Sequence, residues 1–116
     1  MEIRYRVIQG HNRSYDEALR FRAGEQVKVG QRDAHWPSWL WCTVASGAGA
    51  WVPEQFLTFV DNMRAMVKTD YDSIELTVKL GDVVAGSQVL DGWVWCKNVQ
   101  GDEGWVPIEN LQTLRK

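Results

Sequence analysis

The sequence has few cysteines and prolines, no long apolar run and no excess of charge of one sign. Its 116 residues include two cysteines and three prolines, and 13 basic residues stand against 15 acidic ones. A nucleic-acid surface needs an excess of Lys and Arg to meet the phosphates, and a membrane span needs roughly 18 apolar residues in a row. We therefore expect neither a nucleic-acid partner nor a membrane segment.

The start of the chain and the cysteines point to a cytoplasmic protein without a reaction centre. Residues 1–7 alternate charged and apolar side chains, so they lack the basic segment and apolar run of a signal peptide. Cys42 and Cys96 have no CxxC spacing, which fits reduced thiols. His11 and His35 lack a third ligand at metal spacing, and no nucleophile motif or phosphate loop is present. We expect no metal, no cofactor and no catalysis.

What the sequence does contain is an internal repeat rich in tryptophan. Residues 39–42 (Trp-Leu-Trp-Cys) recur at 93–96 (Trp-Val-Trp-Cys), and Trp-Val-Pro recurs at 51–53 and 105–107, both 54 positions apart. Upstream the offset grows to 57 and then 60, which indicates two three-residue deletions in the second copy, between Val67 and Leu76 and between Val84 and Trp93. Loops between matching strands tolerate such length changes. We predict two domains, residues 1–60 and 61–116.

Alternating side chains predict the secondary structure of each copy. Residues 39–44 and 93–99 alternate with the period of half-buried strands, and Gly-rich turns follow at 47–49 and 101–104. Several short strands per copy predict an all-β fold of two consecutive five-stranded barrels. The short, apolar join at residues 59–64 predicts closely packed barrels. One larger intertwined β domain is the alternative.

The order of these motifs resembles the Src-homology-3 (SH3) family, twice, over essentially the whole chain. A member opens with an Ala-Leu-Tyr-Asp-Tyr strand and a long acidic loop. It continues with a Leu-Ser-Phe-x-x-Gly-Glu/Asp turn and a Trp-Trp strand, and closes with Gly-x-Ile/Val-Pro-x-Asn-Tyr-Val. Residues 19–25 and 75–84 resemble the turn, 39–42 and 93–96 the Trp strand, and 51–57 and 104–111 the close. The resemblance implies tandem SH3-like barrels of a variant type, and so compact a tandem suggests a bacterial protein.

The alternation also predicts which side chains fill each barrel. Small barrels need compact interior residues, so we expect these to face inward: Leu40, Cys42, Val52, Val94, Cys96 and Val106. The tryptophans then point outward. Trp41 with Trp51, and Trp95 with Trp105, are expected to be cross-strand neighbours. Such pairs either stabilise the sheet face or are buried between the barrels or in a homodimer.

The resemblance implies an incomplete peptide groove in each copy. In the family, tyrosines, a Trp and a Pro stack on a polyproline II peptide, and loop acids pair with a basic ligand residue. The first copy would use His11, Asp16, Glu17, Trp39, Pro53 and Phe56, with Trp36 at the rim. The second copy would use Tyr71, Asp72, Glu75, Trp93 and Pro107. Gln9 and His11 stand at the tyrosine positions of the first copy, and Thr69 and Asn110 replace a tyrosine each in the second.

These observations favour a non-catalytic module that binds a protein or peptide, for which a proline-rich segment would be the family's typical ligand. A structural or assembly protein is the first alternative, with grooves buried between barrels or in a homodimer. Binding of cell-wall glycans, as in related bacterial SH3 domains, is the second.

Overall fold

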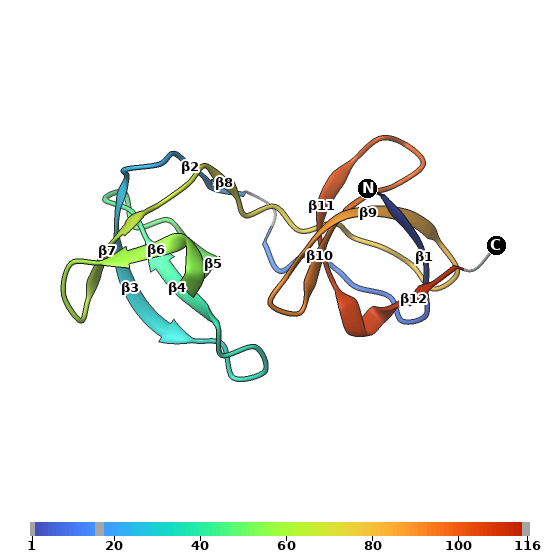
Figure 1. Ribbon diagram of the computed structural model, residues 1–116, viewed down its shortest axis with the longest axis horizontal. Coiled ribbons are helices and arrows are strands. Elements are labelled where there is room, and N and C mark those ends of the chain that lie inside the picture. Colours follow the sequence, from blue (N-terminus) through green and yellow to red (C-terminus); the bar gives the residue numbers. More distant parts are fainter. Residues whose placement is uncertain (1, 16–17, 115–116) are drawn as a thin grey trace. The chain divides into compact units, whose positions relative to one another are not determined.

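The computed structural model describes residues 2–15 and 18–114, and its regular elements are strands and two 3-10 turns (Figure 1). The elements are β1 (Ile3–Val7), β2 (Arg20–Phe21), β3 (Gln26–Arg32), β4 (Trp39–Thr43), β5 (Gly49–Pro53), η1 (Glu54–Phe56), β6 (Leu57–Phe59), β7 (Arg64–Val67), β8 (Tyr71–Asp72), β9 (Val83–Leu90), β10 (Trp93–Lys97), β11 (Glu103–Pro107), η2 (Ile108–Asn110) and β12 (Leu111–Thr113). Within the described residues, no helix has the length and apolarity that a membrane crossing requires.

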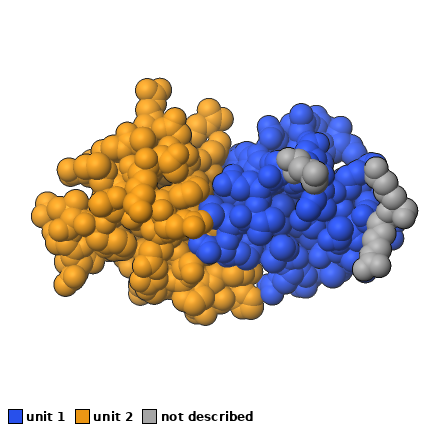
Figure 2. Space-filling model, viewed as in Figure 1, with its two compact units in different colours: residues 1–17, 74–116 blue, residues 18–73 orange. Residues whose placement is uncertain are grey.

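The chain forms two compact units, each with one five-stranded sheet. Unit 1 comprises residues 1–17 and 74–116, and unit 2 comprises residues 18–73 (Figure 2). The sheet of unit 1 has the strand order β11-β10-β9-β1-β12, and that of unit 2 has the order β5-β4-β3-β7-β6. All of these neighbours pair antiparallel. The prediction of an all-β fold with two five-stranded barrels is confirmed.

The first strand of each sequence repeat pairs within the sheet of the other repeat. Strand β1, from the first repeat, lies between β9 and β12 (Figure 1), and the register places Tyr5 opposite Val84 and Thr113. Strand β7, from the second repeat, lies between β3 and β6, with Ala65 opposite Val27 and Phe59. We call this arrangement the strand exchange.

The compact units therefore do not coincide with the domains predicted from the repeats, residues 1–60 and 61–116. Unit 2 is one continuous segment, whereas unit 1 is assembled from two segments on either side of it. Along the chain, the units divide between residues 17 and 18 and between residues 73 and 74.

The join at residues 59–64 is a turn inside unit 2 and not an inter-barrel linker. It connects β6 to β7, which pair as a hairpin. Asp61 Oδ1 accepts hydrogen bonds from the Met63 and Arg64 amides at 2.8 and 2.9 Å, and Asp61 Oδ2 accepts one from Arg64 Nε at 2.9 Å. These bonds hold the turn closed, because an Asp side chain that accepts from the next amides mimics a backbone turn.

The predicted core residues are confirmed in both units. Leu40, Cys42 and Val52 are buried in unit 2, and Val94, Cys96 and Val106 are buried in unit 1. The core of unit 1 also contains Tyr5 and Val7 from β1. The exchanged strand is thus an integral part of the hydrophobic core it joins.

The predicted tryptophan pairs are confirmed as well. Trp41 lies opposite Trp51, and Trp95 lies opposite Trp105. Both pairs meet edge to face, with ring centroids 5.2 and 5.3 Å apart. This is the geometry that aromatic quadrupoles prefer.

Candidate functional site

The strand exchange gathers four family groove residues in unit 2. Trp39 and Pro53 are direct partners across β4 and β5. Tyr71, which the exchange brings from the second repeat, meets Phe56 edge to face, with ring centroids 5.5 Å apart. We call Trp39, Pro53, Phe56 and Tyr71, which occupy positions where the resemblance implies a peptide groove, the aromatic groove. The repeat motifs assign Tyr71 to the second copy with Trp93, whereas the structure places it in the unit of Trp39.

Two further contacts hold the Tyr71 ring in place. Its hydroxyl donates a hydrogen bond to the Trp51 carbonyl at 2.9 Å. Its ring stacks on Phe21, with centroids 6.1 Å apart and an interplanar angle of 22°. Phe21 is brought there by the pairing of β2 with β8. Tyr71 is therefore held in one orientation by both its polar and its apolar parts.

The aromatic groove is more closed than the sequence suggested. Trp39 is 4% exposed and Tyr71 is 6% exposed, Pro53 is fully buried, and Phe56 is half-buried. The expectation that the tryptophans point outward is corrected at Trp39 and Trp93, because Trp93 is also only 8% exposed. Strand alternation assigns a side chain to one face of a sheet, but it does not reveal what packs against that face.

Acidic residues flank Tyr71 on an open side. Arg20 Nε and Asp72 Oδ2 form an ion pair at 3.2 Å, in which the side chains are 86% and 30% exposed. Asp70 Oδ1 accepts a hydrogen bond from the Ala23 amide at 2.9 Å. A concavity of about 350 Å³ lies here, lined by Arg20, Phe21, Arg22, Asp70, Tyr71 and Asp72. The predicted acids of the first copy, Asp16 and Glu17, lie outside the described residues.

Trp36 belongs to the loop before β4. Asp33 Oδ1 accepts hydrogen bonds from the His35 and Trp36 amides at 2.8 and 2.9 Å, and the His35 and Trp36 rings meet edge to face at 4.3 Å. These contacts give the half-buried Trp36 a defined position in unit 2.

Arg32 ties this loop to η1. It donates to the Pro37 carbonyl at 2.8 Å and to both carboxylate oxygens of Glu54, at 2.7 and 3.3 Å. The hydrogen bond from Arg32 lowers the pKa of the Glu54 carboxyl below its usual value. The loop and η1 are thus linked beside the aromatic groove.

At the positions equivalent to Tyr71 and Phe56, unit 1 has polar side chains that already make contacts within the unit. His11 stands where unit 2 has Tyr71, and its ring meets Trp93 edge to face at 5.4 Å. Asn110 stands where unit 2 has Phe56, and its Nδ2 donates to the Gly10 carbonyl at 3.2 Å. Pro107, the partner of Trp93 across β10 and β11, is buried. At the groove positions of the family, unit 1 therefore has one aromatic residue, Trp93, whereas unit 2 has three.

The Glu75 side chain is buried and hydrogen-bonded within unit 1. Its side chain is 6% exposed, and its Oε1 accepts hydrogen bonds from the Ser14 amide at 3.0 Å and the Ser14 hydroxyl at 2.9 Å. His11 Nε2 lies 2.9 Å from the same oxygen. A carboxylate that is buried and already bonded has little capacity left for a basic ligand residue.

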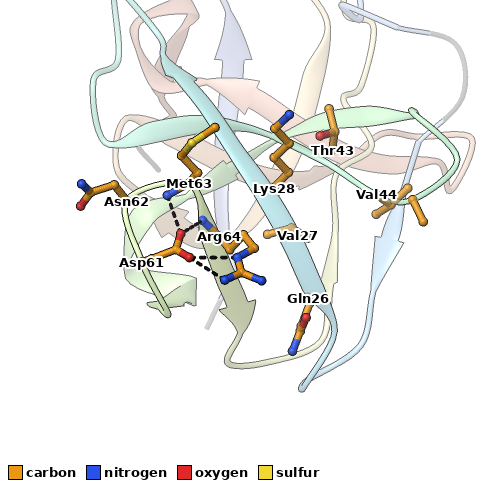
Figure 3. A pocket seen from close by; sticks show the side chains of 10 residues that line it. Gln26, Val27, Lys28, Thr43, Val44, Asp61, Asn62, Met63 and Arg64 are labelled. Atoms are coloured by element: carbon orange, nitrogen blue, oxygen red, sulfur yellow. Dashed lines mark hydrogen bonds and ion pairs between the residues drawn. The ribbon is translucent and has the colours of Figure 1, made fainter.

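A second concavity of unit 2, of about 810 Å³, lies at the other end of β4 (Figure 3). Its lining residues are Gln26, Val27, Lys28, Thr43, Val44, Ala45, Asp61, Asn62, Met63 and Arg64. None of them is aromatic, so this surface does not offer the stacking platform of an SH3 groove. In the described part of the chain, no group of three or more His, Cys, Asp or Glu residues is placed to hold a metal ion.

The two barrels and the Trp-Pro-aromatic groove define the class as SH3-type barrels. The family model of the variant SH3 domain matches residues 4–60 and residues 65–114, so the chain belongs to this family in two copies. SH3 domains are generally non-catalytic modules of protein interaction. A search of curated proteins found no match.

Proposed function

We propose that the chain is a protein-interaction module in which the aromatic groove of unit 2 binds an extended peptide segment of a partner. One observation carries the proposal: the strand exchange unites Tyr71 with Trp39, Pro53 and Phe56. Either sequence repeat alone has a gap in this set. Rings around a proline are the platform on which polyproline II peptides stack.

The flank of the groove indicates the charge of the ligand. Asp70 and Asp72 line the open concavity beside Tyr71, and Asp72 already holds the exposed Arg20. A basic ligand residue would replace Arg20 at little cost, because an exposed ion pair contributes only about 0–1 kcal/mol. The peptide expected to bind is therefore apolar, proline-containing and flanked by Arg or Lys.

The proposal is tested by fluorescence polarisation with labelled twelve-residue peptides that carry Pro-x-x-Pro and a flanking Arg. Binding is expected to fall at least tenfold in Phe56→Ala, which removes a groove wall, and in Asp72→Asn, which removes the acid. Asp102→Asn, in an exposed turn of unit 1, is the matched control and should bind like the parent. Absence of binding to the parent at high micromolar peptide would contradict the proposal.

A second candidate is favoured by the burial of the tryptophans. Trp39 and Trp93 are only 4% and 8% exposed, as expected for an assembly protein whose grooves are occupied, either internally or in a homodimer. Labelling with 5-fluorotryptophan separates the two candidates, with Trp39→Phe used to assign the resonance. A Trp39 signal that shifts with peptide favours binding. An unmoved signal, together with a dimer in analytical ultracentrifugation, favours assembly.

The peptide's sequence class, a cytoplasmic location and a bacterial origin are part of the same proposal. They rest on the resemblance, on the composition and on the family, whose members typically bind proteins or peptides.

A further inference from the structure

We propose that two size-matched core pairs, Tyr5 with Gly86 and Ala65 with Val29, direct the strand exchange and thereby assemble the aromatic groove. Tyr5 and Gly86 would then be positioning residues for a groove that lies in the other unit. The role of that groove rests on the proposed function. The direction of strand pairing is argued from the packing and can be tested without a ligand.

The first pair lies in the core of unit 1. Tyr5 is 5% exposed, and a Cβ atom built on Gly86 would lie 2.6 Å from Tyr5 Cε2 and 2.7 Å from Val94 Cγ1. Carbon atoms do not approach so closely, so the Tyr5 ring occupies the space that any side chain at position 86 would need. A glycine here is the complement of a tyrosine on the neighbouring strand.

The second pair occupies the same positions of unit 2 with the sizes reversed. Ala65 lies opposite Val27 as Tyr5 lies opposite Val84. Val29 is two residues beyond Val27, as Gly86 is two beyond Val84, so Val29 and Gly86 hold equivalent places. Ala65 is fully buried and Val29 is 9% exposed. Unit 2 therefore combines a small residue on the opening strand with a larger one on its neighbour.

Two further core positions follow the same rule. Leu40, which faces Val52, is larger than its counterpart Val94, which faces Val106. Phe21, which faces Tyr71, is larger than its counterpart Val78, which faces His11. In both cases the larger residue is in unit 2, where the opening strand has Ala65 at the position that Tyr5 occupies in unit 1.

Pairing each strand within its own repeat would mismatch both cores. The Tyr5 ring would meet Val29, and Ala65 would face Gly86. The first core would be overpacked and the second would contain a cavity, and close-packed interiors tolerate neither. The exposed ion pair of Arg20 with Asp72 would also be lost, because position 12, equivalent to 72, is Asn.

The strand exchange determines the composition of the aromatic groove because Tyr71 lies close to β7 in the sequence. Tyr71 follows β7 by four residues, so the sheet that accepts β7 also receives Tyr71 beside Phe21 and Phe56. With each strand in its own repeat, Tyr71 would accompany Trp93 and Asn110, and His11 would accompany Trp39.

Engineered disulfides report which pairing the full chain adopts. Arg6 and Gln112 are exposed direct partners across β1 and β12, and Met66 and Thr58 are their equivalents in unit 2. The double variant Arg6→Cys/Gln112→Cys should therefore form an intrachain disulfide only with exchange. Arg6→Cys/Thr58→Cys should form one only without it. The native Cys42 and Cys96 are buried and do not compete.

The decisive variant exchanges the large and small residues of the two opening strands: Tyr5→Ala with Ala65→Tyr. In monomeric protein, this change should lower the yield of the disulfide in the Arg6→Cys/Gln112→Cys background and raise it in the Arg6→Cys/Thr58→Cys background. We expect the ratio of the two yields to shift at least tenfold. The transposition Gly86→Val with Val29→Gly should have the same effect. A purely structural role for these residues would reduce stability without changing the partner of position 6.

Combining all four substitutions restores the matching, so the quadruple variant should fold and form the Arg6/Gln112 disulfide like the parent. This variant also decides the matter if the transposed pairs do not fold. An unfolded quadruple variant, or a disulfide that stays at Arg6/Gln112 in folded transposed variants, would overturn the proposal.

Peptide binding is then measured separately. In a folded transposed variant, binding of the labelled Pro-x-x-Pro peptide should fall at least tenfold, because Tyr71 leaves the groove. If the parent chain binds no peptide but the disulfide changes partner in the transposed variants, the proposed function is contradicted and the positioning role of Tyr5 and Gly86 stands.

Discussion

Two buried cysteines illustrate how single residues depend on their surroundings. Cys42 and Cys96 are fully buried, and burial raises the pKa of each thiol to about 12. A thiol attacks other reagents as its thiolate. These side chains therefore serve as small core residues, as their inward position in the sequence pattern predicted.

The raised thiol pKa values predict slow labelling and loss of stability in alkali. A folded-state pKa above the unfolded value stabilises the protein fully below about 9 and progressively less as the pH rises towards about 12. We expect iodoacetamide to label neither thiol at pH 8 unless denaturant is added. The free energy of unfolding should fall between pH 9 and pH 12, and less steeply in Cys42→Ala/Cys96→Ala. An equal fall in that variant would contradict this account.

The surroundings of Glu75 differ from those expected of a ligand-binding acid, because its side chain is buried. The resemblance implied a ligand-binding acid, whereas the carboxylate is buried and accepts two hydrogen bonds from Ser14 beside His11. Glu75→Ala is expected to lower the free energy of unfolding by about 1–3 kcal/mol, because it leaves these donors without their acceptor. Glu75→Gln should cost less, since its amide keeps one acceptor oxygen.

Urea unfolding measures both variants, with Glu2→Ala as the control. Glu2 is exposed, so its substitution should change stability by less than about 0.5 kcal/mol. Peptide affinity should be unchanged in Glu75→Gln, because the proposed groove lies in unit 2. A Glu75→Gln variant of parent stability that loses peptide binding would return Glu75 to the role the resemblance implied.

Among the elements, the β6–β7 hairpin departs most from expectation. Its turn was predicted as a linker because it joins two sequence repeats, but Asp61 closes it within one sheet. Hydrogen bonds from the Met63 amide and from Arg64 lower the pKa of the Asp61 carboxyl. The turn is thus more stable when Asp61 is ionised.

This predicts a pH dependence that belongs to the turn. The contribution of an Asp with a lowered folded-state pKa is present above its unfolded pKa and is lost as the pH falls through the folded one. Asp61→Ala should therefore have a lower Tm than the parent at pH 7, and the difference should shrink below about pH 4. Thermal unfolding monitored by circular dichroism at pH 3 and pH 7 measures both. A difference that is the same at the two pH values would contradict a role for the carboxylate.

Strand β11 packs closely against the backbone of residues 75 and 76 at Gly104. A Cβ atom on Gly104 would lie 2.7 Å from the Leu76 backbone nitrogen and 2.8 Å from the Glu75 carbonyl carbon, where residue 75 bridges to Trp105. Gly104→Ala should destabilise the protein by about 1–3 kcal/mol, since backbone atoms cannot move aside as a side chain can. Gly10→Ala, whose nearest contact would be 3.3 Å, is the control and should cost less in urea unfolding. Equal losses would contradict this account.

At the scale of the whole molecule, the repeat motifs predicted two five-stranded barrels but not which segments form each. Motif matches such as the two Trp-Val-Pro strands reveal equivalent positions, and equivalent strands satisfy either barrel by pattern alone. The distinguishing information lies in side-chain size, at Tyr5, Ala65, Val29 and Gly86, which alternation of apolar and polar residues does not encode. For the same reason, the repeat motifs assigned Tyr71 to the copy of Trp93, whereas Tyr71 lies in the unit of Trp39.

The exchange also shapes how the molecule is assembled. Unit 2 is continuous in the chain, whereas unit 1 requires β1 to reach β9 and β12, with Tyr5 opposite Val84 and Thr113. Pairing of such distant segments carries a larger loop-closure cost. We expect unit 2 to be protected from amide hydrogen exchange earlier than β1 during refolding, in pulse labelling read out by mass spectrometry. Simultaneous protection of β1 and β7 would contradict this order.

The strand exchange is the central claim, and cross-strand proton contacts in the unmodified monomer test it most directly. In an NMR nuclear Overhauser experiment, the account predicts contacts between the backbones of residues 5–7 and 111–113, and between those of 65–67 and 57–59. Contacts of residues 5–7 with 57–59, and of 65–67 with 111–113, would show each strand within its own repeat. That result would contradict the strand exchange, the aromatic groove and the function proposed for that groove.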